Sequence, residues 1–176
     1  MSATLMNKPQ WLEELAQFIV EANRVTWAGD GKGVVPERPG YKELQYQRGL
    51  WRLRDSYTGY FRAPGMTTVY NPERPVWTMS YGGKGQHEEY YDQAQETFSF
   101  LKAALMKVTA ALPYRGPPEF TQNGKIYRCN VRGDITDFLG NEEIWNQGNR
   151  EFSQWFGGGI VLHKDQQRQV IYPWDT

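Results

Sequence analysis

Hydrophobic side chains recur every three or four positions in two stretches of the chain. In the first stretch, which follows the candidate N-cap Asn7 and ends near Val25, they form one face, and Glu13 and Glu21 lie on the opposite face. This spacing predicts an amphipathic helix that packs against the rest of the protein through one stripe. In residues 87–112 the same spacing predicts a longer helix, which Pro113 ends.

Alternating hydrophobic and polar positions dominate two further regions, one after each predicted helix. Turn signals divide each region into runs, and the clearest is Asn123-Gly124, a dipeptide typical of tight hairpins. A period of two is that of a strand with one buried face, so each region predicts about four antiparallel strands. We expect strands at residues 42–47, 50–57, 66–71 and 76–81, and then at residues 119–122, 126–132, 134–138, 142–146 and 150–156.

The two regions also resemble each other. Residues 77–83 contain two aromatics with three residues between them, followed by Gly-Gly, and residues 152–158 repeat this pattern 75 positions later. Further matches occur at the same offset: Gly65 with Gly140, Val69 with Ile144, and Tyr70 with Trp145. We interpret the chain as a single domain, residues 1–176, that contains an internal repeat of residues 9–83 and 87–158.

The expected fold is therefore of the α+β class. Two tandem units, each a helix plus four antiparallel strands, form one curved sheet with two helices packed on one face. The match is imperfect, because the alternation in residues 51–57 is out of phase with that in residues 126–132. A one-residue slip turns every side chain to the other face, so we expect a bulge or deletion between the copies here.

Alternation also divides the side chains of each strand between two faces. Trp77 and Tyr81 point one way, and Val76, Thr78 and Ser80 point the other way. We expect the small and aliphatic set under the helices, and the aromatic set in a cleft between the two halves. The alternative is that the aromatics simply fill a wide core, as large aromatics commonly do.

Polar groups among these aromatics suggest a ligand site. Arg54 and Arg62 lie close in sequence to several tyrosines, and such an arginine can fix a carboxylate or stack on a planar ligand. It can equally extend across an exposed sheet face. The predicted ligand-binding residues are Arg54, Tyr57, Tyr60, Arg62, Tyr70, Trp77, Tyr81, Glu143, Trp145 and Phe156.

Composition and charge exclude several other classes of protein. The 20 basic residues balance the 20 acidic ones, so broad binding to nucleic acid is not expected. No apolar run approaches the roughly 20 residues that span a bilayer, and the N-terminus lacks the order of a signal peptide. The single cysteine, Cys129, lies in an apolar alternation, which predicts a buried, inert thiol and a cytoplasmic protein. His87 and His163 lack ligand spacing, so we expect no metal and no cofactor.

Several runs of the chain resemble a bacterial domain family of unknown function. They are residues 54–65, 75–77 and 81–83, together with Trp11-Leu12 and the connector Arg115-Gly116-Pro117. Some members of that family are fused to helix-turn-helix repressor-type domains, and the resemblance implies no assigned activity. The expected architecture is also similar to the duplicated effector-binding domains of multidrug-sensing regulators.

Three functions remain open on the sequence alone. The first is a small-molecule binding or sensing domain with an aromatic cleft between the two halves. The second is a protein-interaction module or regulatory subunit, with a homo-oligomer as one form. The third is an enzyme that uses carboxylate and tyrosine acid–base groups, for which Asp55, Tyr57 and Glu143 are the candidates. No catalytic signature is present, which favours a binding protein over an enzyme.

Overall fold

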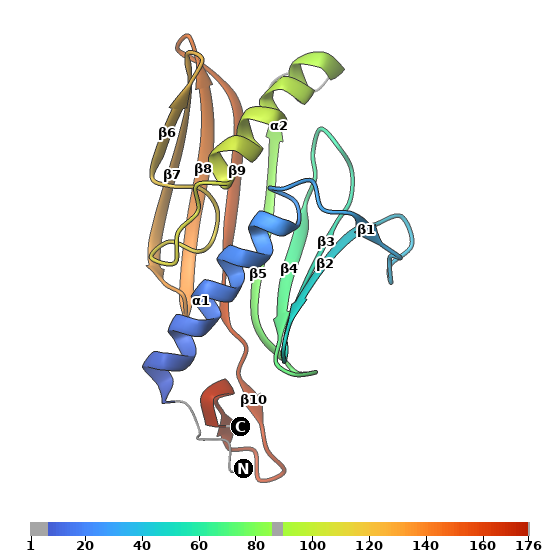
Figure 1. Ribbon diagram of the computed structural model, residues 1–176, viewed down its shortest axis with the longest axis vertical. Helices are drawn as coiled ribbons and strands as arrows, with labels where there is room; N and C mark the ends of the chain where they lie inside the picture. Colours follow the sequence, from blue (N-terminus) through green and yellow to red (C-terminus); the bar gives the residue numbers. More distant parts are fainter. Residues whose placement is uncertain (1–6, 86–89, 176) are drawn as a thin grey trace.

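The protein folds as two helices against one large antiparallel sheet (Figure 1), in a computed structural model that describes residues 7–85 and 90–175. The helices are α1 (Lys8–Val25) and α2 (Tyr91–Leu105). The nine strands of the sheet are β1 (Gly33–Val34), β2 (Lys42–Arg48), β3 (Trp51–Tyr57), β4 (Gly65–Tyr70), β5 (Pro75–Gly85), β6 (Glu119–Gln122), β7 (Lys125–Asp134), β8 (Asp137–Asn146) and β9 (Asn149–Ile160). A hairpin of β10 (His163–Lys164) and β11 (Val170–Ile171) and a 3₁₀ turn, η1 (Pro173–Asp175), follow. The α+β class predicted from the sequence is confirmed.

The first helix forms as its sequence predicts. Asn7 caps it, since its side chain accepts a hydrogen bond from the backbone N–H of Gln10 at 3.1 Å and the Gln10 side chain accepts one in return. The apolar stripe is buried and includes Leu15 and Phe18, and the Phe18 ring stacks on Trp51 of β3 with 5.6 Å between centroids. This stripe therefore fixes α1 against the first strands of the sheet.

The second helix is shorter than the sequence predicts. We expected it to continue to residue 112, but it ends at Leu105, and residues 87–89 of that prediction lie outside the described residues. Beyond Leu105 the chain tightens into a turn, in which the N–H of Val108 bonds to the Leu105 carbonyl at 3.1 Å. Arg24 of α1 donates to the Val108 carbonyl at 2.7 Å. Val108 is fully buried although it lies in a turn. The apolar spacing in the sequence therefore continues beyond the end of the helix.

The sheet has the strand order β1-β2-β3-β4-β5-β9-β8-β7-β6, and every neighbouring pair is antiparallel. The central pair is β5 and β9, in which Tyr81 lies opposite Phe156. The register shifts next to Tyr70 in β4 and again, 75 residues later, next to Trp145 in β8. The β2–β3 and β6–β7 turns, in contrast, are 74 residues apart, at Gly49 and Asn123. This one-residue difference accounts for the out-of-phase alternation in the sequence.

The covered face of the sheet is the reverse of the one that we expected. Cross-strand pairing places Leu53, Val69 and Trp77 in one row, on the same side as the Trp51 ring that contacts α1. The aromatic set therefore packs under the helices, and Ser80, from the set expected there, is exposed. Alternation in the sequence shows which side chains share a face of a strand. The helices cover the aromatic face because its large rings fill the space beneath them.

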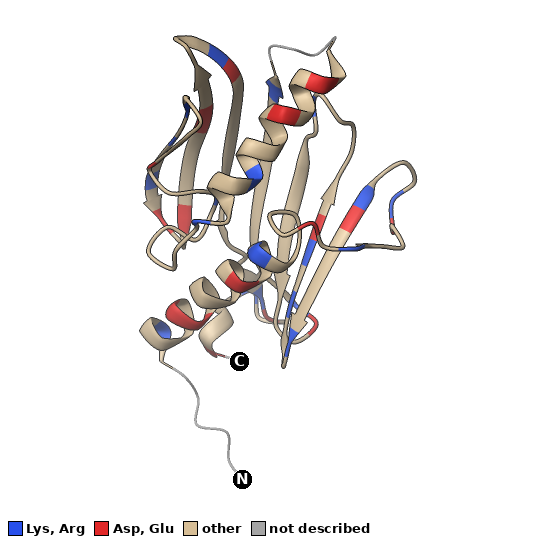
Figure 2. Cartoon of the chain, turned by 45° about the horizontal axis from the view of Figure 1, so that its top comes forward, with Lys and Arg blue, Asp and Glu red and all other residues tan. Residues whose placement is uncertain are grey.

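Both helices contact this one face of the sheet. Phe100 of α2 lies 5.6 Å from Phe120 of β6, and Phe98 lies 6.2 Å from Phe152 of β9, measured between ring centroids. Figure 1 shows both helices in front of the sheet, with α1 across β5 and its neighbours and α2 nearer β9. Figure 2 shows basic and acidic residues intermixed along the helices and the sheet.

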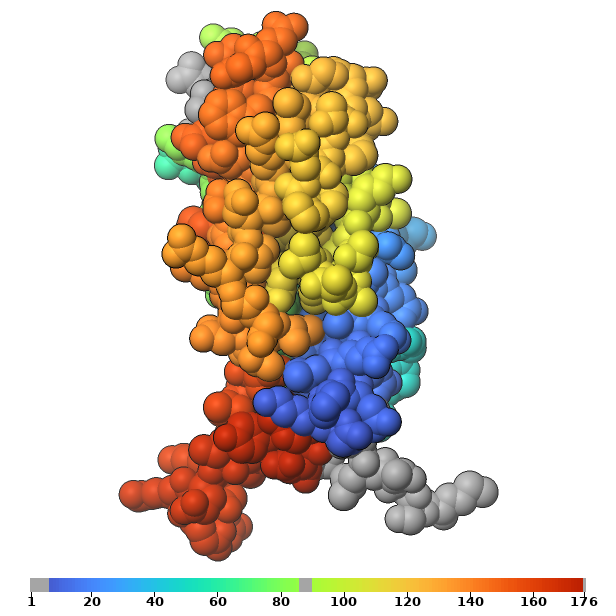
Figure 3. All heavy atoms as spheres, turned by 90° about the vertical axis from the view of Figure 1, so that its left-hand side faces the viewer, coloured from blue at the N-terminus to red at the C-terminus, as the bar shows by residue number. Residues whose placement is uncertain are grey.

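The C-terminal segment closes one end of the core. Trp174 lies edge-on to Trp11 of α1 at 5.9 Å and stacks on Tyr172 at 5.0 Å. Figure 3 shows this red segment directly beside the blue start of α1. The two ends of the described chain thus stabilise each other.

Candidate functional site

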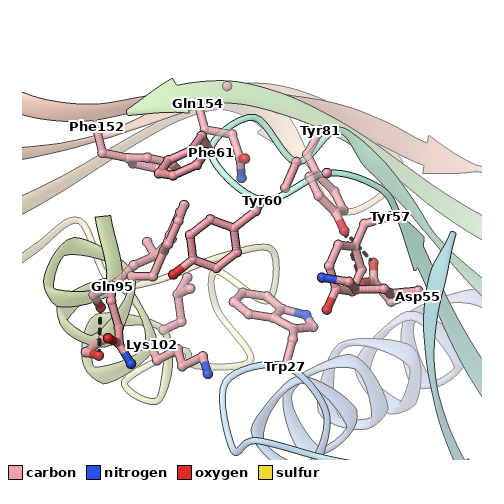
Figure 4. A pocket seen from close by; sticks show the side chains of 18 of the residues that line it. Trp27, Asp55, Tyr57, Tyr60, Phe61, Tyr81, Gln95, Lys102, Phe152 and Gln154 are labelled. Carbon is pink, nitrogen blue, oxygen red and sulfur yellow. Dashed lines mark hydrogen bonds between the residues drawn. The ribbon is translucent and has the colours of Figure 1, made fainter. Parts of the chain in front are cut away.

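A cavity of about 420 Å³ lies between the helices and the covered face of the sheet. Its volume is in the range of pockets that hold small ligands. Its walls come from segments far apart in the sequence, and Figure 4 shows their side chains converging on one space. The principal lining residues are Trp27, Lys42, Asp55, Tyr57, Tyr60, Phe61, Tyr81, Tyr91, Gln95, Phe98, Lys102, Arg115, Phe152 and Gln154.

The segment between β3 and β4 forms one wall. Residues 58–64 connect these strands, whereas two residues connect β7 and β8. Gly59 has a φ of +79°, and a Cβ there would collide with the carbonyl oxygen of Arg62. Tyr60 stacks on Tyr91 of α2 at 5.3 Å and lies edge-on to Phe98 at 5.4 Å. Aromatic contacts of this kind hold the segment against α2.

Asp55 forms the polar floor of the cavity. The residue is 1% exposed, and its carboxyl group accepts hydrogen bonds from the Thr67 hydroxyl at 2.7 Å and from the Tyr81 hydroxyl at 3.0 and 3.1 Å. Burial raises the pKa of Asp55, although both hydrogen bonds act in the opposite direction. Burial and the nearby Asp55 carboxyl raise the pKa of Tyr81 well above its usual value. Tyr81 therefore stays protonated and acts as the donor to Asp55.

A glycine makes this arrangement possible. A Cβ at Gly65 would lie 2.6 Å from Cζ of Tyr81 and 2.8 Å from the carbonyl oxygen of Ser56. The missing side chain leaves the room in which the Tyr81 ring reaches Asp55. Gly140 has the same relation to Phe156, because a Cβ there would lie 2.5 Å from Cζ of that ring.

A buried ion pair lies beside the floor. Arg115 is 5% exposed and Glu142 is fully buried, and both Nε and Nη2 of Arg115 donate to Oε1 of Glu142, at 2.9 and 2.7 Å. Glu142 also accepts from the Tyr127 hydroxyl at 2.6 Å and from the Gln154 amide at 2.9 Å. Burial acts to lower the pKa of Arg115, but the Glu142 charge outweighs it, so the pKa is raised and the guanidinium stays charged.

The guanidinium also contacts aromatic rings of the cavity. It lies 4.2 Å from the centroid of Trp27 and 5.5 Å from that of Tyr81. Cations placed over aromatic faces are attracted by the negative potential of the ring. Arg115 thus joins the polar floor to the aromatic walls.

Cys129 lies on β7, next to the strand that carries Glu142, and has the buried thiol that the sequence predicts. Cys129 lies opposite Glu142, and burial together with this carboxylate raises the pKa of the thiol to about 11. The thiol is therefore protonated near neutral pH and is a poor nucleophile.

Of the ten residues predicted for the site, the structure brings three to the cavity: Tyr57, Tyr60 and Tyr81. Trp77 does not reach it, because its ring is fully buried and stacks on Phe138 at 5.6 Å. Phe156 is also fully buried, 6.3 Å from Phe138. For these two residues the wide-core alternative describes what the structure shows.

The other five predicted residues lie away from the cavity. Arg54 forms ion pairs with Glu37 and Glu43. The Tyr70 ring lies 4.0 Å from the guanidinium carbon of Arg52.

Glu143 pairs with Arg150 at 2.8 Å and accepts a hydrogen bond from the Trp145 indole at 3.0 Å. Arg62 lines a groove that also includes Trp155, and it does not line the cavity. These residues lie on the solvent face of the sheet or at its margins because the covered face is the opposite one.

Sequence reasoning missed most of the cavity walls. Phe98 fits the apolar stripe of the second predicted helix, which predicts a core position, and Trp27 lies in a loop without periodicity. Phe152 belongs to the aromatic set expected in the cleft but is not among the ten predicted site residues. Arg115 appeared only in the connector that carries the family resemblance. The sequence around Arg115 does contain a sign of burial. This arginine lies between Tyr114 and Gly116-Pro117 and lacks the polar neighbours that are typical of a solvated loop.

Comparisons with known proteins identify the family but no activity. The model of a domain of unknown function, DUF5680, matches residues 55–161, which include most of the cavity walls. No curated protein and no solved structure matches the chain. Within the described residues, no helix is both long and apolar enough to cross a bilayer, and no three or more His, Cys, Asp and Glu side chains cluster as metal ligands would. The match covers more than half of the chain, which therefore belongs to the DUF5680 family.

Proposed function

We propose that this protein is a small-molecule binding or sensing domain and that its ligand occupies the cavity between the helices and the sheet. The observation that carries the proposal is the cavity of about 420 Å³ with aromatic walls and a buried polar floor. Ligand pockets typically combine mostly apolar walls with a few convergent polar groups.

The buried charges support this proposal. Replacing a buried ion pair by apolar side chains is often neutral or stabilising, so stability alone does not require Arg115 and Glu142. The same holds for Asp55, whose raised pKa reflects the unfavourable burial of its charge. Perturbed ionisable groups that line a cavity are typical of functional sites.

We also propose that residues 9–83 and 87–158 arose by duplication and that the cavity lies where the two halves meet. The mirrored order of β2–β5 and β6–β9 supports this, as does the recurrence of the register shift after 75 residues. Asp55 and Tyr81 come from the first half, and Phe152 and Gln154 come from the second. Fusion to helix-turn-helix modules, which the sequence resemblance implies for some members, fits a sensing role.

Thermal unfolding in the presence of planar and apolar compounds tests the function. A compound present at about 100 times its Kd adds about 2.7 kcal/mol, which raises the Tm of a domain of this size by roughly 5–11 °C. Tyr57→Ala removes one aromatic wall and is expected to abolish the shift. Trp155→Ala is the matched control, because this ring is 56% exposed outside the cavity. A flat response across a broad library, or an equal loss in both variants, contradicts the proposal.

An acid–base enzyme is the second candidate, and one observation favours it. Asp55 and Tyr81 share a hydrogen bond inside the cavity, and the pKa of each is raised. Compounds that stabilise the protein are incubated with it and analysed by mass spectrometry, with Tyr81→Phe as the comparison. Conversion by the wild type alone indicates catalysis, and unchanged compounds indicate binding without chemistry.

A further inference from the structure

We propose that the cavity selects a planar aromatic carboxylate and that Arg115 receives its carboxylate group. This inference rests on the proposed binding function and adds the chemical class of the ligand. It depends on the unused donors of one buried side chain, on the charges around the cavity and on the shape of its walls.

The first observation is an incomplete set of hydrogen bonds at Arg115. A guanidinium carries five N–H donors, and Arg115 uses Nε and Nη2 on one oxygen of Glu142. No group in the described ranges, 7–85 and 90–175, accepts a hydrogen bond from its Nη1. The side chain is 95% buried, at 5% exposure, and it lines the cavity.

The unused donors still reach open space. Among the described residues, Oδ1 of Asn23 is the only fully buried side-chain polar atom without a partner. Nη1 of Arg115 is therefore not sealed within packed atoms but adjoins the space that the side chain lines. A charged donor held at such a position is suited to an oxyanion, because hydrogen bonds between ionised groups are the strong ones.

The second observation is an excess of positive groups around the cavity. Lys42, Lys102 and Arg115 line it, against the single carboxyl group of Asp55. Lys102 pairs with Asp30, but the lysine side chain is 42% exposed and the aspartate 76%, so the pair is weak. Because burial raises the pKa of Asp55, this group keeps its proton at a higher pH than usual and repels an anion less. The charge of Glu142 balances that of Arg115. Lys42 and Lys102 therefore supply the net positive charge that attracts an incoming anion.

The third observation is the shape of the aromatic walls. Figure 4 shows Tyr60 and Trp27 pointing into the same space, with Tyr81 and Asp55 at one side of it. Trp27 is also the ring under the Arg115 guanidinium, at 4.2 Å. A flat ring between these aromatics would thus reach Arg115 with a carboxylate at its edge.

An organic cation is the competing class of ligand, since aromatic rings and a carboxyl group also suit a cation. Two features disfavour it. The Asp55 carboxyl group already accepts hydrogen bonds from Thr67 and Tyr81, whereas the donors at Nη1 of Arg115 have no acceptor in the part of the chain that the structure describes. The lysines that line the cavity would repel a cation.

Three probes of one shape separate the classes: 2-naphthoate, the neutral 2-naphthamide and the cationic 2-naphthamidine. Calorimetric titration of the full chain is expected to give 2-naphthoate a Kd at least about tenfold lower than that of the amide, a difference of roughly 1.4 kcal/mol. Equal affinity for the acid and the amide overturns the carboxylate preference and leaves the binding function intact. Tightest binding of the amidine also overturns it, in favour of a cation. If none of the three binds, the inference fails, and the thermal unfolding screen of the broad library then decides separately whether the binding function stands.

Variants assign the preference to Arg115. Arg115→Lys keeps a charge for Glu142 but removes the planar fork, so the affinity for 2-naphthoate is expected to fall about tenfold while that for the amide changes less than about twofold. Circular dichroism and the Tm show whether this variant folds. Lys102→Met, at a more exposed position, gives a second readout: a loss of roughly threefold in 2-naphthoate affinity and a weaker dependence on salt. Lys164→Met, outside the cavity, is the matched control. If Arg115→Lys folds and still prefers 2-naphthoate over the amide as strongly as the wild type does, the carboxylate site at Arg115 is overturned. If Arg115→Lys does not fold, the same unchanged preference in Lys102→Met overturns it.

Discussion

Removal of Glu142 tests whether the buried ion pair holds the floor of the cavity together. Glu142→Leu keeps a similar volume but deletes the acceptor of four hydrogen bonds, two of them from Arg115. The other two come from the Tyr127 hydroxyl and the Gln154 amide. Arg115, which is 5% exposed, would then be a buried charge without its partner.

The expected loss of stability is large. Breaking a buried ion pair by removal of one partner costs about 3–5 kcal/mol in the free energy of unfolding. For a domain of 150–250 residues each kcal/mol corresponds to roughly 2–4 °C, so the Tm should fall by roughly 6–20 °C. The estimate applies to this pair because both members are at least nine-tenths buried.

Urea unfolding followed by tryptophan fluorescence measures the loss, and a double variant is the control. Arg115→Met with Glu142→Leu removes both charges, so it is expected to recover at least about 2 kcal/mol relative to Glu142→Leu alone. The Tyr127 hydroxyl would still accept from the Gly116 N–H, now at 3.0 Å. A cost below about 1 kcal/mol for the single variant, or no recovery in the double variant, refutes the reasoning.

Three further outcomes are expected. Asp55→Asn removes a pH dependence. Because the pKa of Asp55 is raised in the folded state, the folded wild type binds this proton more tightly than the unfolded chain does, so the stability of the wild type relative to the variant should fall as pH rises above about 3.8. A flat difference in urea unfolding between pH 4 and 8 would contradict this. Gly65→Ala should cost about 1–3 kcal/mol, because the new Cβ overlaps the Tyr81 ring, whereas Gly33→Ala, whose Cβ would lie 3.6 Å from its nearest neighbour, serves as a well-tolerated control in the same assay. The Cys129 thiol, with a pKa of about 11, should react with a disulfide reagent at pH 8 only after urea unfolds the protein, and rapid labelling of the folded protein would show that it is accessible.

Local signals predicted the elements of the fold well. The start of α1 follows from the capping residue Asn7, and the hairpin at Asn123-Gly124 follows from its turn dipeptide. Both depend on neighbours within a few residues, which the sequence displays directly. The end of α2 was mispredicted because Val108 continues the apolar period while a distant side chain, Arg24, binds its carbonyl.

The candidate site could be predicted only in part, because it depends on distant contacts. Alternation shows that Trp77 and Ser80 point to opposite sides, but it does not show which side the helices cover. Tyr57 and Tyr81 were found through their aromatic context, whereas Trp27 and Arg115 reach the cavity only because loops carry them there. No periodicity encodes such a convergence.

The segment between β3 and β4 has a consequence for stoichiometry. A wall of seven residues, 58–64, stands on one side of the central strands, and the corresponding place between β7 and β8 holds a two-residue turn. Tyr81 also carries a hydroxyl group where its cross-strand neighbour Phe156 has none. The two halves of the sheet thus offer unequal surroundings, and under the proposed binding function each chain would hold one ligand molecule in a single orientation.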